Sequence, residues 1–284
     1  MSTNNLVLNR LFTQHVFKDL LNDGENNVYG TVVKRYLDNS DSKDNGTLIS
    51  EVYRVLSKSY RNEYFYMNTL LNKLLLGKHS VNTTTALTQI PIGNSKADFI
   101  LINGKAVVYE IKTDLDSFER LDTQLDDYYK AFDHVCVVTS ENSYQKLFKL
   151  LQNTSVGIYV LTKRNTLSTV MGKEPIADKK FLEHTAIFKI LHKKEYENII
   201  RSFYGELPSA TPAFYYRECL SWFSKIPISS AYSMFLEQLK TRNKIVLEDF
   251  QEVPYELKAL MYFSKNSVLK YNDLKSFLNK RYGG

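Results

Sequence analysis

The chain has 284 residues, of which 43% are hydrophobic and 24% are charged, and it carries a formal net charge of +6. This composition is enough to bury a sizeable core in one large domain or two modest ones, and it excludes a largely disordered chain. No run of about 18 apolar residues is present, so no membrane-spanning helix is expected. The N-terminus lacks a basic-then-apolar secretion signal, and two cysteines cannot form a disulfide framework, so a cytoplasmic protein is expected.

Helical spacing of apolar residues dominates the beginning of the chain. Residues 5–21 carry one apolar stripe, and a polar, glycine-ended loop follows over residues 38–46. A strong amphipathic helix is expected from about Leu48 to Leu76, with a break near Ser59. It ends before Gly77, a residue type that often lies just past a helix end.

Strand-like sequence follows this helix. The expected strands are residues 85–92, 97–102, 105–113 and 134–139, with an edge hairpin from 156–161 and 168–171. Asn103-Gly104 is a strong hairpin signal between the second and third strands. Helical spacing returns over residues 118–132. The order of helix, three strands, helix and strand predicts an α/β fold with an αβββαβ core and a mixed sheet.

The composition changes again near residues 165–180. Five of the six prolines lie beyond Lys173. The helical patterns there cover residues 181–203, 213–223, 229–239, 254–263 and 271–280. We therefore predict an N-terminal helical extension over 1–47, an α/β core over 48–172 and an all-helical module over 173–284.

Nearly all of the net positive charge lies in the predicted helical module. Residues 178–284 contain 17 basic and 12 acidic side chains, whereas the rest of the chain has an excess of a single positive charge. Such a module could attract a polyanion such as nucleic acid. On charge alone, an ordinary solvated helical surface is the simpler interpretation.

Three charged residues lie at the ends of two adjacent predicted strands. Asp98 begins one apolar strand, and Glu110 and Lys112 end the next. Side chains two residues apart on a strand share a face, so Glu110 and Lys112 project together. Both faces of that strand are apolar, and charges there are costly unless they meet one another or a metal ion. The cluster predicts a site for a hard divalent cation, with the ammonium group orienting a water molecule or neutralising a phosphate.

The register of the predicted hairpin decides whether these residues meet. A two-residue turn at Asn103-Gly104 would place the Asp98 and Glu110 side chains on opposite faces of the sheet. A three-residue loop or a single bulge would shift the register by one residue and bring both acids and Lys112 to one face. We predict the shifted register.

The three residues resemble the signature of the PD-(D/E)XK nuclease superfamily. Asp98, Glu110 and Lys112 match its Asp…Glu-x-Lys pattern, and the predicted αβββαβ order matches its core. Ala97 stands where the pattern has proline, which is a frequent departure. The resemblance implies a restriction-endonuclease-like fold.

A second motif lies on the helix predicted after these strands. Gln124 and Tyr128 resemble the Gln-x-x-x-Tyr motif of the RecB-like branch of the superfamily. Residues four apart share a helix face, so both could point to the same site. The run from Tyr60 to Thr139 also looks like a little-studied group of bacterial and phage proteins in this superfamily, which implies a phage or mobile-element setting. The helical module after Pro175 matches no specific family.

The resemblance also implies roles for individual residues. The implied metal ligands are Asp98, Glu110 and the main-chain carbonyl of Ile111, and the implied catalytic residues are Asp98, Glu110, Lys112, Gln124 and Tyr128. Mg²⁺ or Mn²⁺ is the implied cofactor, and Lys112 would position or activate the attacking water. Gln124 and Tyr128 would fix the site or the phosphate.

The superfamily often has a further acidic residue on its first core helix. Glu63 is the candidate here, because Glu63, Met67, Leu70 and Leu74 fall on one helical stripe that is expected to face the core. Glu63 would then reach the same metal ion through water. The alternative is a surface carboxylate at a helix boundary.

Other polar residues near the motif have structural interpretations. Asp114 and Asp116 are expected to be solvated or to act as caps. Asp126 and Asp127 are expected to be exposed. A lone histidine at a strand edge, such as His134, is more often structural than phosphate-binding.

A metal-dependent nuclease acting on DNA is therefore the expected function, with RNA as an open alternative. The second hypothesis is a nucleic-acid-binding or regulatory protein that keeps the fold without turnover. A third is an interaction module whose C-terminal helices dock a protein partner. A homodimer would be needed if one site per chain cut both strands of a duplex.

Overall fold

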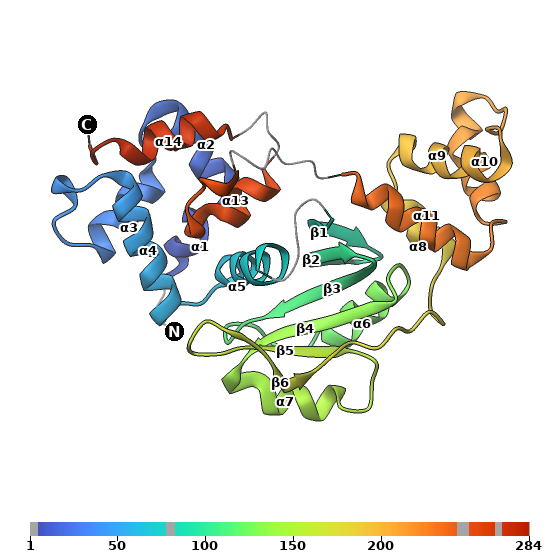
Figure 1. Ribbon diagram of the computed structural model, residues 1–284, viewed down its shortest axis with the longest axis horizontal. Helices are drawn as coiled ribbons and strands as arrows, with labels where there is room; N and C mark the ends of the chain where they lie inside the picture. The colour runs from blue at the N-terminus through green and yellow to red at the C-terminus, as the bar shows by residue number, and fades with distance from the viewer. Residues whose placement is uncertain (1–4, 78–82, 243–249, 265–268, 284) are drawn as a thin grey trace. The chain divides into compact units, whose positions relative to one another are not determined.

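The computed structural model describes residues 5–77, 83–242, 250–264 and 269–283 (Figure 1). The chain divides into two compact units. The helical unit comprises Met1–Lys78 and Ile245–Gly284, and the sheet unit comprises His79–Lys244. Within the described ranges, no helix combines the length and the apolar character needed to cross a bilayer.

The helical unit is built from both ends of the chain. Its helices are α1 (Leu6–Leu11), α2 (Gln14–Asp23), α3 (Asn27–Tyr36), α4 (Asn45–Ser59), α5 (Glu63–Leu70), a π-helical turn η3 (Leu71–Leu76), α13 (Lys258–Phe263) and α14 (Tyr271–Asn279). Two short 3₁₀ turns, η2 (Ser40–Ser42) and η4 (Tyr255–Leu257), complete it. Side-chain caps fix several helix starts: Asp44 accepts from the Thr47 amide, and Asn62 accepts from the Phe65 amide. The Asn62 cap separates α4 from α5 and explains the predicted break in the 48–76 helix.

A buried polar contact joins the two ends of the chain. Asn45 accepts a hydrogen bond from the Tyr29 hydroxyl at 2.7 Å and donates to the Phe277 carbonyl at 3.1 Å. Because α14 packs on α4 and α13 packs on α5, the C-terminal helices belong with the N-terminal ones.

The sheet unit contains one mixed six-stranded sheet. The strands are β1 (Thr85–Ile92), β2 (Ser95–Asn103), β3 (Lys105–Lys112), β4 (His134–Ser140), β5 (Gly157–Leu161) and β6 (Leu167–Lys173), and they lie side by side in chain order. The β3–β4 and β4–β5 pairs are parallel, and the other three pairs are antiparallel. This confirms the predicted α/β fold and mixed sheet.

Helices cover a hydrophobic cluster on the sheet. They are α6 (Leu121–Tyr129), α7 (Glu141–Leu151), α8 (His184–Ile190), α9 (Lys193–Tyr204), α10 (Pro212–Phe223) and α11 (Ile228–Lys240). Helix α7 is not among the predicted elements, although the Ser140 cap and the apolar spacing of Leu147 and Leu151 are local signals for it. The predicted helix over 181–203 is two helices, because His192 and Glu195 form a capping box that starts α9.

These units divide the chain at other places than the predicted boundaries near residues 47 and 173. Residues 48–76 pack with the C-terminal helices, whereas α8 and α11 pack on β1 and β2. A buried hydrogen bond also ties α11 to the sheet unit, since the Tyr232 hydroxyl of α11 donates to Asp133 at 2.6 Å. Long-range contacts of this kind have no local sequence signal.

Candidate functional site

The β2–β3 hairpin has the predicted shifted register. Asn103 pairs with Lys105 across Gly104, and Phe99 pairs with Tyr109. Gly104 has a φ of +69°, a left-handed conformation that favours glycine. The next residues beyond the Phe99–Tyr109 pair are Asp98 and Glu110, which therefore fall opposite one another on neighbouring strands. The register prediction is confirmed.

Glu110 is a buried carboxylate whose two oxygens are both hydrogen-bonded. It is only 2% exposed. The Tyr128 hydroxyl lies 2.6 Å from Oε2, and Gln124 donates from Nε2 to Oε1 at 2.6 Å. Gln124 and Tyr128 lie one turn apart on α6, so the helix presents both donors to β3. The second sequence motif thus meets the first in space.

Lys112 completes this cluster. Its Nζ lies 3.0 Å from Oε1 of Glu110 and donates to Oε1 of Gln124 at 2.8 Å. Lys112 is 8% exposed. Two buried opposite charges therefore compensate each other, with a neutral amide hydrogen-bonded to both. Thr139 of β4 donates to the Lys112 carbonyl at 2.9 Å and fixes the end of the strand.

Asp98 lies at the border of the cluster and is half-buried. Its Oδ2 accepts from the Ile111 amide of β3 at 2.8 Å. The paired residues of β2 and β3 end at Phe99 and Tyr109. Beyond that pair, the Asp98 carboxylate accepts from the Ile111 amide, which holds Asp98 beside Glu110.

Tyr128 is a neutral hydrogen-bond donor in this cluster. Burial raises the pKa of its hydroxyl well above the usual value, and the nearby Glu110 charge raises it further. The hydroxyl also lies 2.9 Å from the Lys96 carbonyl, so Tyr128 links β2 to β3.

Asp127 corrects one expectation of the sequence analysis, because it is buried rather than exposed, at 4%. Its carboxylate accepts from the Asn94 amide at 3.0 Å, from the Ser95 hydroxyl at 2.8 Å and from Lys130 at 2.8 Å. Burial acts to raise the pKa of Asp127, but the bonds from Lys130 and Ser95 outweigh it and lower the pKa. Asp127 therefore binds the β1–β2 turn through hydrogen bonds. Asp126 is exposed as expected.

Two glycines allow a matched test of this contact between Asp127 and the β1–β2 turn. Gly93 and Gly104 both have positive φ. A Cβ on Gly93 would clash with the Asp127 carboxylate, whereas a Cβ on Gly104 would meet no atom of the described residues within 4 Å. Alanine at either position carries the left-handed cost of about 1–2 kcal/mol. Gly93→Ala is expected to cost a further 1–3 kcal/mol or so through overpacking. Urea unfolding followed by fluorescence of Trp222, the only tryptophan, measures both; equal losses would contradict the tight contact.

Glu63 is the first residue of α5 and its side chain is exposed. Leu70 and Leu74 of its predicted stripe are buried, whereas Met67 is half-buried. Glu63 belongs to the helical unit and the other candidate residues to the sheet unit. Its role as a metal ligand stays a prediction.

The donor set suits a hard cation with few protein ligands. In the part of the chain that the structure describes, no three His, Cys, Asp or Glu side chains group to hold a metal ion. Mg²⁺, however, needs only one or two carboxylates and keeps several waters. Asp98, Glu110 and the Ile111 carbonyl are oxygen donors of this kind. Among the described residues, Oε2 of Glu110 has one hydrogen-bond partner, which leaves it acceptor capacity.

The remaining polar residues have the predicted structural roles. Asp116 accepts from the Thr113 amide at 2.8 Å, and Asp114 accepts from the Asn142 amide group at 3.2 Å and from the Ser140 hydroxyl. His134 lies 2.8 Å from Asp133.

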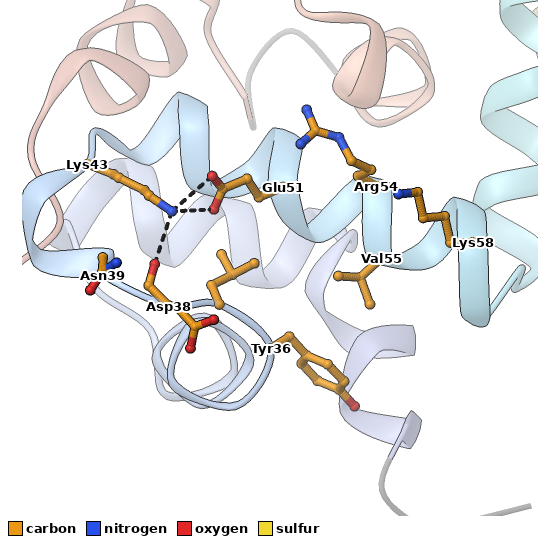
Figure 2. Close-up of a pocket in the computed structure, with 9 residues that line it drawn as sticks. Tyr36, Asp38, Asn39, Lys43, Glu51, Arg54, Val55 and Lys58 are labelled. Carbon is orange, nitrogen blue, oxygen red and sulfur yellow. Dashed lines mark hydrogen bonds and ion pairs between the residues drawn. The ribbon is translucent and has the colours of Figure 1, made fainter.

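A cavity of about 340 Å³ lies in the helical unit (Figure 2). Its lining residues come from the chain before the predicted motif residues. Lys43 spans one side of it, donating to both oxygens of Glu51 at 2.8 and 2.9 Å and to the Asp38 carbonyl at 3.0 Å. No motif in the sequence pointed to this cavity. The candidate site remains the cluster of Asp98, Glu110, Lys112, Gln124 and Tyr128, where two sequence motifs meet.

The fold and the cluster define an α/β protein with a buried Glu–Lys pair held between a mixed sheet and one helix. The family model described as Bacteriophage P4 protein cII matches residues 57–274, so the chain belongs to this family. A relative named Protein cII, from Enterobacteria phage P4, is 24% identical over 216 residues, which is 69% of this chain and 78% of the relative. No solved structure matches.

Proposed function

We propose that the chain is a metal-dependent nuclease that hydrolyses phosphodiester bonds in DNA. The observation that carries this proposal is the meeting of Glu110 and Lys112 with Gln124 and Tyr128, next to Asp98. Residues that were picked out by two separate motifs form one hydrogen-bonded cluster. A buried ion pair at a strand end contributes little net stability, which favours a functional reason for it.

In the proposed site, Asp98, Glu110 and the Ile111 carbonyl would hold Mg²⁺ or Mn²⁺. When bound, the cation polarises a phosphoryl oxygen and makes water a stronger nucleophile. The protein residues supply orientation. Gln124 is hydrogen-bonded to both Glu110 and Lys112, so it fixes the spacing of the carboxylate and the ammonium group.

Lys112 has the most direct role in this proposal. Its ammonium group has three hydrogen-bond donors; one of them is used by Gln124, and Glu110 compensates its charge at 3.0 Å. The ammonium group can also orient the attacking water or contact a phosphate oxygen. Tyr128 remains protonated because its pKa is raised, so it keeps Glu110 in place as a neutral donor.

The alternative is a nucleic-acid-binding or regulatory protein of the same fold that does not turn over. One observation favours it: the Glu110 and Lys112 charges already compensate each other, so the cluster is stable without a ligand. A protein partner docking on the C-terminal helices and a homodimer are further proposals that the candidate site does not bear on.

The test is incubation of the purified chain with linear duplex, covalently closed circular and single-stranded DNA, and with RNA. Each substrate is combined with Mg²⁺, Mn²⁺ or EDTA. Cleavage with either metal and none with EDTA is expected, and cutting of the closed circle identifies an endonuclease. Salt-dependent DNA binding without cleavage would favour the silent alternative. A protein that neither binds nor cleaves nucleic acid would refute both the nuclease proposal and this alternative.

A further inference from the structure

The edge strand β1 contains a residue in an unusual backbone conformation. Gln89 lies inside the strand yet has a φ of +56°. Strand residues have negative φ, and a left-handed residue other than glycine, asparagine or aspartate is uncommon. Such strained residues gather at functional sites, where the surrounding structure holds them.

The position of Gln89 relates it to the candidate site. Thr88 pairs with Phe99 and Ile90 pairs with Ala97, so Gln89 falls opposite Asp98 on β2. The Thr88 hydroxyl donates to the Asp98 carbonyl at 2.6 Å. The unusual conformation in β1 therefore lies directly beside the main chain of the predicted metal ligand.

The same segment is held from α6. Asp127 binds the Asn94 amide and the Ser95 hydroxyl in the β1–β2 turn, and the Tyr128 hydroxyl lies 2.9 Å from the Lys96 carbonyl. Two adjacent residues of α6 thus fix the start of β2. Tyr128 also contacts Glu110, so one helix sets the start of β2 relative to that carboxylate.

The Asp98 side chain completes the arrangement. Its Oδ2 takes the Ile111 amide where the β2–β3 pairing has ended. The carboxylate position therefore depends on the path of β2 over residues 95–98, and that path is set by α6 on one side and by β1 on the other.

We propose that the β1–β2 hairpin positions the Asp98 carboxylate, and that Gln89 is the positioning residue whose left-handed conformation sets the hairpin path. This inference rests on the proposed function, because Asp98 is a metal ligand only in that proposal. A β1 strand that ran straight through position 89 would shift the main chain of Asp98 relative to Glu110.

The experiment compares Gln89→Gly with Gln89→Val. Glycine adopts positive φ without cost, whereas valine disfavours it strongly. Mn²⁺ affinity is measured by electron paramagnetic resonance, together with the melting temperature and the Mn²⁺ dependence of DNA cleavage. Gln89→Gly is expected to bind Mn²⁺ like the wild type. Gln89→Val is expected to bind about tenfold more weakly, in the range found for residues that orient metal ligands.

A matched control separates positioning from general destabilisation. Asn165 also has positive φ, at +58°, in the loop between β5 and β6. Asn165→Val is expected to lower the melting temperature without changing the Mn²⁺ affinity. If Gln89→Val does not fold, Thr88→Val, which removes only the hydroxyl bonded to the Asp98 carbonyl, takes its place, with a weaker Mn²⁺ affinity again expected.

The outcomes distinguish the two proposals. A folded Gln89→Val protein with wild-type Mn²⁺ affinity would overturn the positioning role. If Thr88→Val is used in its place, a folded Thr88→Val protein with wild-type Mn²⁺ affinity would overturn that role as well. A wild-type protein that binds no Mn²⁺ and cuts no nucleic acid would instead overturn the proposed function, and the positioning role with it.

Discussion

Substitution of Lys112 by methionine is expected to slow metal-dependent DNA cleavage by about 10³-fold, a loss in the range seen when a group that assists proton transfer is removed. Methionine has a similar length and no charge, so it fills the space between Glu110 and Gln124 but cannot orient a water molecule or contact a phosphate. The measurement is the single-turnover cleavage rate at saturating Mg²⁺, with DNA binding followed in parallel by fluorescence anisotropy. Binding is expected to change little.

The matched control is Lys149→Met on α7, an exposed lysine of the same unit. It makes the same change in net charge and is expected to leave the cleavage rate unchanged. Cleavage by Lys112→Met at the wild-type rate would remove Lys112 from the proposed chemistry. An equal loss in both variants would point to net charge and DNA attraction rather than to the site.

The αβββαβ order and the register of the central hairpin could be predicted because both leave strong local signals. Strand-like runs and the Asn103-Gly104 pair locate β2 and β3 directly. The register followed from a physical requirement, since charges on a strand that is buried on both faces need partners on the same face. Gln124 and Tyr128 could be placed at the site because helical spacing fixes which residues share a face.

Other features depend on contacts between distant parts of the chain. Nothing near Asn45 indicates that it binds the Phe277 carbonyl, so the association of the two chain ends could not be predicted. Asp127 looks like a surface residue of an amphipathic helix, and its burial depends on the Gly93-Asn94 turn lying beside it. The positive φ of Gln89 likewise has no local signal, because the residue there is neither glycine nor asparagine.

The second large effect concerns the stability of the buried ion pair. Lys112→Met alone leaves the Glu110 carboxylate buried without its cation, and breaking a buried pair in this way costs about 3–5 kcal/mol. Glu110→Gln alone leaves the ammonium group similarly unpaired. The double variant Glu110→Gln with Lys112→Met removes both charges, so it is expected to recover most of the lost free energy of unfolding. Urea unfolding followed by Trp222 fluorescence measures the complete cycle.

This cycle separates stability from chemistry at the same two positions. In the double variant, the new amide at position 110 can accept from Nε2 of Gln124 and donate to the Tyr128 hydroxyl, which keeps the Lys96 carbonyl as its acceptor, so both charges are removed while most of these polar contacts are kept. The double variant is therefore expected to be nearly as stable as the wild type and still to cleave DNA no faster than Lys112→Met. Recovery of cleavage together with stability would mean that the pair acts only through folding. Loss of stability that adds up over the two single changes would mean that Glu110 and Lys112 are not energetically coupled, contrary to their 3.0 Å contact.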